Sequence, residues 1–67
     1  MKKNNCIIRP ELIKQGLCPP IGDNMYAPSD NTVYEYRWLR LGKEEFFQVL
    51  FNERWENATS IDFDFLN

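Results

Sequence analysis

Hydrophobic and polar residues alternate along the C-terminal half of this chain, with the two-residue period of a β-strand that buries one face. A first strand is predicted from Thr32 to Leu41, followed by a turn at Gly42-Lys43 and a second strand over residues 46–51. The first strand carries two distinct faces, one with Tyr34, Tyr36, Trp38 and Arg40, the other with Val33, Glu35, Arg37, Leu39 and Leu41. In the second strand, one face carries Phe47, Val49 and Phe51, and the other Phe46, Gln48 and Leu50.

A third strand is predicted from Trp55 to Phe65, after a turn at residues 52–54. Its inward face would carry Trp55, Ile61, Phe63 and Phe65, and its outward face Asp62 and Asp64. A one-residue slip would bury the two aspartates, so the register should be firm. The alternation weakens over residues 57–59, where we expect a bulge or bend. Short turns between consecutive strands predict an antiparallel three-stranded meander over residues 32–67.

The N-terminal half is predicted to be less regular. Residues 1–5 are polar and are expected to fray, and Cys6–Ile8 suits a short strand. Pro10–Gly16 is predicted to form a brief helix, because proline suits the first helical position and glycine the left-handed stop. Residues 18–23 form a stiff connector with two prolines, and a candidate short strand follows at Met25–Ala27.

These elements predict one mainly β domain over residues 1–67 with a single short helix. Four or five antiparallel strands would either close as a small SH3-like barrel or form a strongly bent sheet. The segment Ile21–Tyr26, followed by Ala27-Pro28, resembles the opening of such barrels, where a Gly-Asp turn leads into the first strand. The alternative is a three-stranded sheet with the Pro10–Gly16 helix packed on it.

Charge and composition narrow the choice of partner and compartment. Ten acidic and eight basic residues are interspersed and give a net charge of −2, which argues against a general nucleic-acid coat protein. No apolar run approaches the roughly 20 residues that span a bilayer, and no secretory apolar segment follows Lys2 and Lys3. We therefore expect a cytoplasmic protein without membrane contact. Cys6 and Cys18 are expected to be reduced, with a disulfide as the alternative.

No motif indicates catalysis. The chain has no histidine, and its three glycines are scattered turn residues rather than a phosphate-binding loop. The carboxylate pairs are Glu44/Glu45 and Asp62/Asp64, and a solvated strand face is their plainest interpretation. Two thiolates would leave a tetrahedral metal site half filled. We expect no enzyme activity, no metal and no cofactor.

The first hypothesis is a small non-enzymatic protein-binding module or regulator. Both faces of the central strands carry large apolar residues, and tyrosine, tryptophan and arginine together are typical of protein-binding hot spots. Such small chains are common as regulators encoded by phages or mobile elements and as accessory subunits. The expected contact residues are Tyr36, Trp38 and Arg40, with Asp62 and Asp64 as a second, acidic patch.

Two alternatives stay open. A nucleic-acid-binding small barrel would use the basic and aromatic strand, through Tyr34, Arg37, Trp38 and Arg40. A self-associating structural subunit would use the same surplus of apolar area. Against the nucleic-acid hypothesis, the rings could be half-buried sheet residues, with the arginines paired across strands to Glu45 or Glu53. Against the protein-binding hypothesis, the Pro19–Asn31 segment and the short helix could cover the second face of the sheet.

Overall fold

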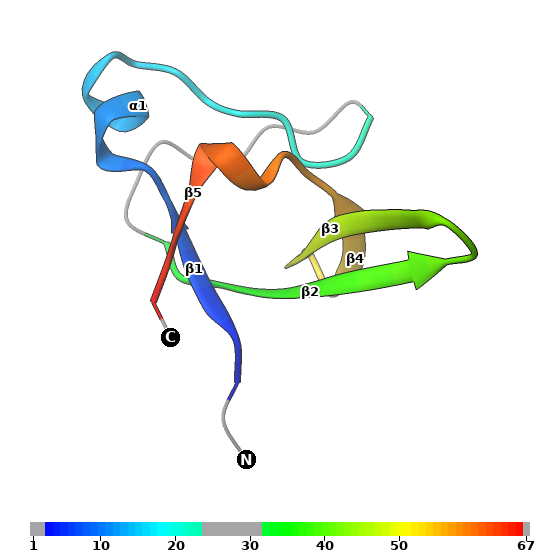
Figure 1. Ribbon diagram of the computed structural model, residues 1–67. Helices are drawn as coiled ribbons and strands as arrows, with labels where there is room; N and C mark the ends of the chain where they lie inside the picture. The colour runs from blue at the N-terminus through cyan, green and yellow to red at the C-terminus, as the bar shows by residue number, and fades with distance from the viewer. Residues whose placement is uncertain (1–2, 24–31, 67) are drawn as a thin grey trace.

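Five strands form one antiparallel sheet in the computed structural model, which describes residues 3–23 and 32–66 (Figure 1). The strand order is β4-β3-β2-β1-β5. In chain order the elements are β1 (Asn5–Ile8), α1 (Pro10–Lys14), β2 (Tyr34–Leu41), β3 (Glu44–Phe51), β4 (Arg54–Asn57), the 3₁₀ turn η1 (Ser60–Asp62) and β5 (Phe63–Phe65). The predicted mainly β fold with one short helix is confirmed. The candidate strand Met25–Ala27 lies outside the described residues.

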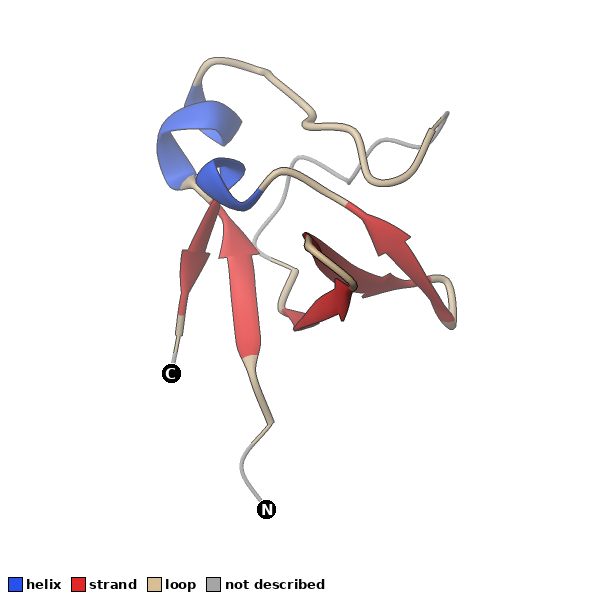
Figure 2. Cartoon of the chain, turned by 45° about the vertical axis from the view of Figure 1, so that its right-hand side comes forward, coloured by secondary structure: helices blue, strands red, loops and turns tan. Residues whose placement is uncertain are grey.

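The sheet is open and strongly bent, and β2 makes the bend. Its first two residues, Tyr34 and Glu35, pair with β1, whereas Tyr36–Leu41 pair with β3. Figures 1 and 2 show β1 and β5 running side by side and steeply across the direction of the β2–β3 hairpin. Within the described residues β4 and β5 are the two ends of the sheet, so the bent sheet is confirmed and the closed barrel is not formed.

Both hairpins lie where turns are predicted, but the second turn has two residues rather than three, because β4 already begins at Arg54. Gly42 and Lys43 join β2 to β3, and the register places Tyr36 opposite Val49 and Trp38 opposite Phe47, as the alternation predicts. Between β3 and β4 the two turn residues, Asn52 and Glu53, have φ angles of 51° and 65°. Positive φ at both central residues is the requirement of the tight hairpin turn whose twist matches the flanking strands. Asn52 suits this conformation, whereas Glu53 adopts it at the position where such turns prefer glycine.

The predicted third strand is divided in two. β4 ends at Asn57, η1 follows, and β5 begins at Phe63 on the far side of β1. The bend expected at residues 57–59 is confirmed, but the continuous strand is wrong, and so are the inward positions of Ile61 and Trp55. Trp55 lies opposite Leu50, on the outer face of the sheet. Phe63 is 2% exposed and Ile61 is 70% exposed. The reason is that a 3₁₀ turn does not keep the two-residue period, so the parity of Ile61 no longer decides its side.

The N-terminal strand is held from both sides. β1 already includes Asn5, which the sequence analysis placed in the terminal segment. The amide of Tyr36 donates to the carbonyl of Asn4, and the amide of Leu66 donates to the carbonyl of Asn5, each at 2.9 Å. β1 therefore joins the meander to the C-terminal strand and is central to the fold.

The helix after β1 is one turn long and stops at glycine. It spans Pro10–Lys14, and Gly16 follows with a φ of +74°. The amide of Leu17 then donates to the carbonyl of Leu12 at 2.9 Å. This left-handed termination matches the role predicted for the glycine. Leu12 and Ile13 are half-buried against the core, so the helix closes one end of the molecule (Figure 2).

The core lies on the inner side of the bend. It contains the buried side chains of Cys6, Ile8, Ile21, Tyr34, Phe47, Val49 and Phe63. Tyr34 contacts Phe63 edge to face, with ring centroids 6.4 Å apart, and lies 6.2 Å from Phe51. The core thus draws residues from β1, β2, β3, β5 and the connector that follows α1.

The two cysteines differ in reactivity. Both thiols are free, which agrees with the expected reduced state, but Cys6 is fully buried and Cys18 is partly exposed. Burial raises the pKa of the Cys6 thiol from 9.0 to about 12. Because the thiolate is the reactive form, we expect iodoacetamide at pH 8 to modify Cys18 alone in the native protein. Intact-mass measurement should show one addition, and a second only in denaturant. Two rapid additions without denaturant would contradict the burial of Cys6.

Candidate functional site: an aromatic surface on the inner face

Beyond the core, the inner face of the sheet continues as a group of aromatic rings. Tyr36 and Trp38 rest on the buried Phe47, with ring centroids 5.7 and 5.3 Å away. Phe65 completes the group at 4.8 Å from Tyr36 and 5.9 Å from Phe47. Trp38 is 49% exposed and Phe65 is 45% exposed. We call Tyr36, Trp38 and Phe65 the aromatic surface.

Strand pairing explains why these rings meet. The alternation of β2 puts Tyr36 and Trp38 on the face of the core, and the β2–β3 register places Trp38 opposite Phe47. Phe65 comes from the end of the chain, where β5 pairs antiparallel to β1 and Phe65 lies opposite Cys6. Cys6 in turn lies opposite Tyr34 of β2, so β1 carries the C-terminal strand to within reach of Tyr36.

The margins of the aromatic surface are charged and apolar. Arg40 lies two residues beyond Trp38 on the same face of β2, opposite Glu45 of β3, and both are exposed. This register places Arg40 opposite Glu45, one of the two partners named in the alternative to a binding role. Leu66, which is 54% exposed, follows directly after Phe65. A partner that covers the rings would therefore meet a cation, a carboxylate and further apolar area at the rim.

The structure separates the other predicted contact residues from this surface. Tyr34 is buried in the core, with 6% of its surface exposed. Arg37 belongs to the opposite face of β2, where its Nε donates to Oε1 of Gln48 at 2.8 Å and its guanidinium lies 4.4 Å from the ring centroid of Trp55. Tyr34, Arg37, Trp38 and Arg40 thus do not form one stacking platform.

Asp62 and Asp64 do not project from one strand face, and the prediction that they would is wrong. Asp62 belongs to η1, where its backbone carbonyl accepts a hydrogen bond from the Arg9 amide at 3.0 Å. Asp64 belongs to β5, and its Oδ1 lies 3.8 Å from Nε of Arg9, with both side chains nearly half exposed. An exposed pair of this kind contributes about 0–1 kcal/mol.

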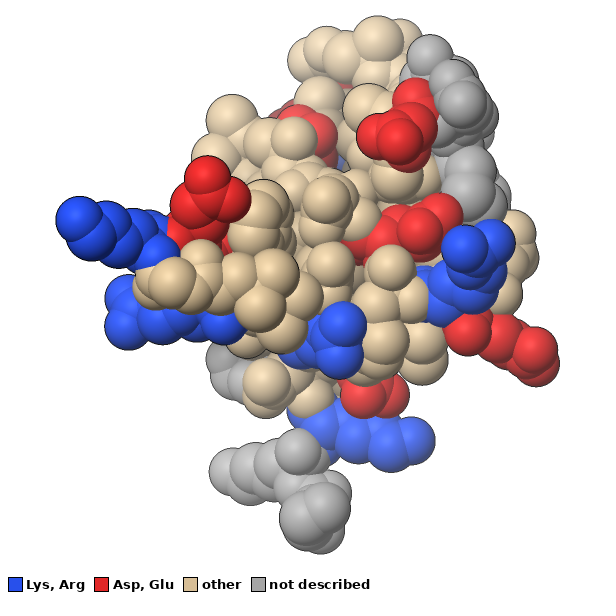
Figure 3. Space-filling view, turned by 90° about the vertical axis from the view of Figure 1, so that its right-hand side faces the viewer, with Lys and Arg blue, Asp and Glu red and all other residues tan. Residues whose placement is uncertain are grey.

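Charges on the surface are mixed in sign. Figure 3 shows acidic and basic side chains next to one another, with uncharged residues between them, on the side of the molecule seen at the right of Figure 1. This distribution follows from the interspersed charges of the sequence. No large field of one sign appears in this view that would attract a polyanion over a distance.

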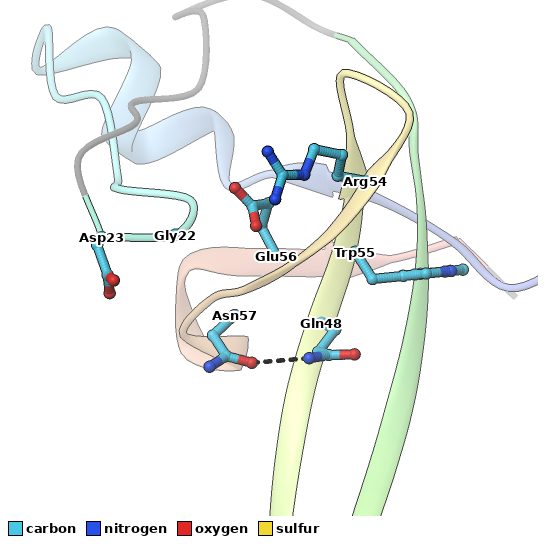
Figure 4. A pocket seen from close by; sticks show the side chains of 7 residues that line it. All are labelled: Gly22, Asp23, Gln48, Arg54, Trp55, Glu56 and Asn57. Carbon is cyan, nitrogen blue, oxygen red and sulfur yellow. Dashed lines mark hydrogen bonds between the residues drawn. The ribbon is translucent and has the colours of Figure 1, made fainter.

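A small pocket, which the sequence analysis did not predict, lies between the Gly22-Asp23 loop and the edge strand β4 (Figure 4). Its volume is about 360 Å³, and it is lined by Gly22, Asp23, Gln48, Arg54, Trp55, Glu56 and Asn57. The loop is fixed to the strand by a hydrogen bond of 2.7 Å from the Gly22 amide to the Asn57 carbonyl. No sequence motif marks this site, because the loop and β4 are far apart in the chain.

Gly22 has a left-handed backbone that favours glycine, and it lies close to the Glu56 side chain of β4. Its φ is +79°, and a Cβ there would lie 2.9 Å from Oε2 of Glu56. We expect Gly22→Ala to lower the free energy of unfolding by about 1–2 kcal/mol through backbone strain, and to displace the Glu56 side chain. Gly16→Ala is the matched control, because its φ is +74° but its Cβ would meet nothing within 4 Å. The Glu56 carboxylate ends a flexible side chain that can move aside, so urea denaturation should give the two variants about the same cost. An unchanged stability of Gly22→Ala would contradict the left-handed backbone at this position.

Comparison with known proteins does not assign the chain to a family. No family model matches the chain, and neither the curated proteins nor the solved structures contain a significant match. Among residues 3–23 and 32–66, no helix is long and apolar enough to cross a membrane. Within the same ranges, no three histidine, cysteine, aspartate or glutamate side chains are grouped to hold a metal ion. The function must therefore be argued from the surfaces themselves.

Proposed function

We propose that this chain is a small, non-enzymatic protein-binding module that acts in the cytoplasm and contacts its partner through the aromatic surface, with Arg40 at the rim. One observation supports the proposal above the others. Trp38 and Phe65 remain about half exposed although both rest on the buried ring of Phe47. Folding has ordered these rings without removing them from water.

A partner would gain from the exposure of these rings and from their fixed packing on Phe47. Covering apolar surface contributes roughly 25 cal/mol per Å² of area removed from water. Rings that already pack on Phe47 lose little further conformational freedom when a partner covers them, which lowers the cost of association. Tryptophan, tyrosine and arginine are also the residues most enriched at the energetic centres of protein interfaces. Contiguous exposed apolar area of this kind usually marks a partner site.

The size of the chain and its mixed charge suggest two biological settings. Regulators encoded by phages or mobile elements, and accessory subunits of larger assemblies, both act by contact rather than by chemistry. We propose one of these roles. In either case the partner would be another protein whose binding site presents apolar side chains to the rings and a carboxylate to Arg40.

Affinity capture with matched variants tests the proposal. The tagged wild type, Trp38→Ala and Leu41→Ala would be incubated with extract of the native host, and captured proteins identified by mass spectrometry. Leu41 is the control, because it is 60% exposed on the opposite face of β2. We expect a protein captured by the wild type and Leu41→Ala and lost with Trp38→Ala, and direct binding once it is purified. The same capture by all three proteins would contradict the proposal.

Two further measurements address the alternatives. Labelled single- and double-stranded oligonucleotides at low salt should not bind, whereas micromolar, salt-sensitive binding would favour the nucleic-acid hypothesis. Sedimentation over a range of concentrations should give a constant monomer mass. A mass that rises with concentration would favour the self-associating subunit.

A further inference from the structure

The pocket beside β4 is a second candidate binding site, distinct from the aromatic surface. Trp55, Gln48 and Asn57 belong to the outer face of the meander, whereas Arg54 and Glu56 lie opposite Phe51 and Val49 on the inner face, so the pocket wraps around the edge of β4. None of the seven lining residues belongs to the aromatic surface. Among the seven lining residues, five have planar polar side chains and Trp55 is the single aromatic one. The volume of about 360 Å³ lies near the lower end of the range for small-molecule sites. Its lining indicates a small and polar ligand.

A chain of hydrogen bonds across three strands fixes which amide atoms the pocket presents. Arg37 can only donate, so Gln48 must turn its Oε1 toward the guanidinium, at 2.8 Å from Nε. Its Nε2 then donates to Oδ1 of Asn57 at 2.9 Å (Figure 4). The Nδ2 group of Asn57 is thereby left as the donor that faces away from Gln48. The orientation of both amides follows from the arginine alone, without any reference to hydrogen positions.

The wall therefore holds donors and acceptors close together. Asp23 and Glu56 supply carboxylate oxygens, while Asn57 and Arg54 supply N–H groups. Arg54 and Glu56 project from the same side of β4, so a cation and a carboxylate share one side of the pocket (Figure 4). An anionic ligand would be repelled by the two acids, and a cationic ligand would meet Arg54. A neutral ligand whose groups both donate and accept avoids both penalties.

We propose that this pocket binds a single neutral sugar residue. Each hydroxyl of a sugar can donate to a carboxylate and accept from an amide, which matches the alternating groups around Asp23 and Asn57. The C–H groups of the sugar ring would lie against Trp55, whose indole is held in place by the guanidinium of Arg37 at 4.4 Å. The site is shallow, so we expect a dissociation constant on the order of millimolar.

An NMR titration tests the proposal. The ¹⁵N-labelled full chain would be titrated separately with glucose, galactose, mannose and N-acetylglucosamine. We expect at least one sugar to cause saturable shifts in the side-chain amide signals of Asn57 and in the backbone amides of Gly22, Asp23 and residues 54–57. Asp23→Asn and Glu56→Gln should weaken that binding about tenfold or more, because each removes a charged acceptor. Asp23→Asn changes an exposed loop residue, so the variant should fold.

Glu45→Gln is the matched control, since it removes an exposed carboxylate on β3 that does not line the pocket. The affinity of this variant for the sugar should equal that of the wild type. The proposal is overturned if none of the four sugars gives saturable shifts at these residues, or if Asp23→Asn and Glu45→Gln bind equally well. It is also overturned if free arginine or lysine binds at these residues more tightly than every sugar, which would make the pocket a cation site.

Discussion

Replacement of Phe63 by alanine should leave the chain largely unfolded at room temperature. Phe63 is 2% exposed and touches Tyr34 and Phe47, with ring centroids at 6.4 and 5.5 Å. Truncating a buried phenylalanine to alanine costs about 3–5 kcal/mol. A domain of this length has a total stability of roughly 3–10 kcal/mol, so the loss removes much or all of it. Circular dichroism during urea or thermal denaturation measures the effect.

Ile61→Ala is the control for this prediction, because it lies two residues away and is 70% exposed. Substitutions at such surface positions usually change stability by no more than about 0.5 kcal/mol. A continuous strand from Trp55 to Phe65 would instead bury both side chains and make both changes costly. Similar destabilisation by the two variants would therefore contradict the break at η1.

Replacement of Trp38 by alanine should have the largest effect on partner binding. Truncation of a tryptophan at the centre of an interface typically costs 2 kcal/mol or more, which corresponds to a loss of affinity of about thirtyfold or more. Because Trp38 is 49% exposed, the unfolding free energy should change much less than it does for Phe63→Ala. Titration calorimetry with the purified partner, together with denaturation of the free variant, separates the two effects.

Leu41→Ala serves as the matched control in the same titration. Leu41 is 60% exposed and lies three residues further along β2, on the opposite face. Its removal should change affinity less than about twofold. A larger loss with Leu41→Ala than with Trp38→Ala would move the binding site to the outer face, where Leu39, Phe46 and Trp55 are partly buried.

Much of the fold could be predicted because it depends on residues that are close together in the sequence. The period of two indicates the faces of β2 and β3, and the turn signals at Gly42-Lys43 and at residues 52–54 indicate where the two hairpins lie. These features depend on neighbours within a few residues, where pattern and turn chemistry act directly. The same reasoning located Tyr36 and Trp38 on one face, and the structure has them there.

The path of the C-terminal strand could not be predicted in this way. The alternation indicated that Phe63 and Phe65 point inward, but it carried no information about the strand that they would pair with. β5 pairs with β1, at the other end of the chain. This pairing depends on the turn at Ser60–Asp62 and on the hydrogen bond from the Arg9 amide to the Asp62 carbonyl. Pairing over such sequence separations is decided by tertiary packing, which overrides local preference.

The two sites differ in the same respect. Part of the aromatic surface could be predicted, because Tyr36, Trp38 and Arg40 share one face of a single strand. Phe65 could not, because it reaches Tyr36 only through the pairing of β5 with β1. The pocket was not predicted, since it needs the connector Gly22-Asp23 to dock on β4. Tyr34 is misplaced in the predicted contact surface because strand parity alone does not say which part of a face the core covers. Arg37 lies on the opposite face by parity, so the alternation itself separates it from Trp38 and Arg40. Bending at Tyr36 decides that Tyr34 is covered and Trp38 is not.

The central claim is that the C-terminal strand leaves the meander, pairs with β1 and brings Phe65 beside Tyr36. Nuclear Overhauser contacts between the ring protons of these residues test it most directly, because their centroids lie 4.8 Å apart. We predict strong contacts between the two rings, with backbone contacts between Ile7 and Asp64. Contacts from Phe65 to the edge of β4 in place of those to Tyr36 would contradict both the fold and the aromatic surface.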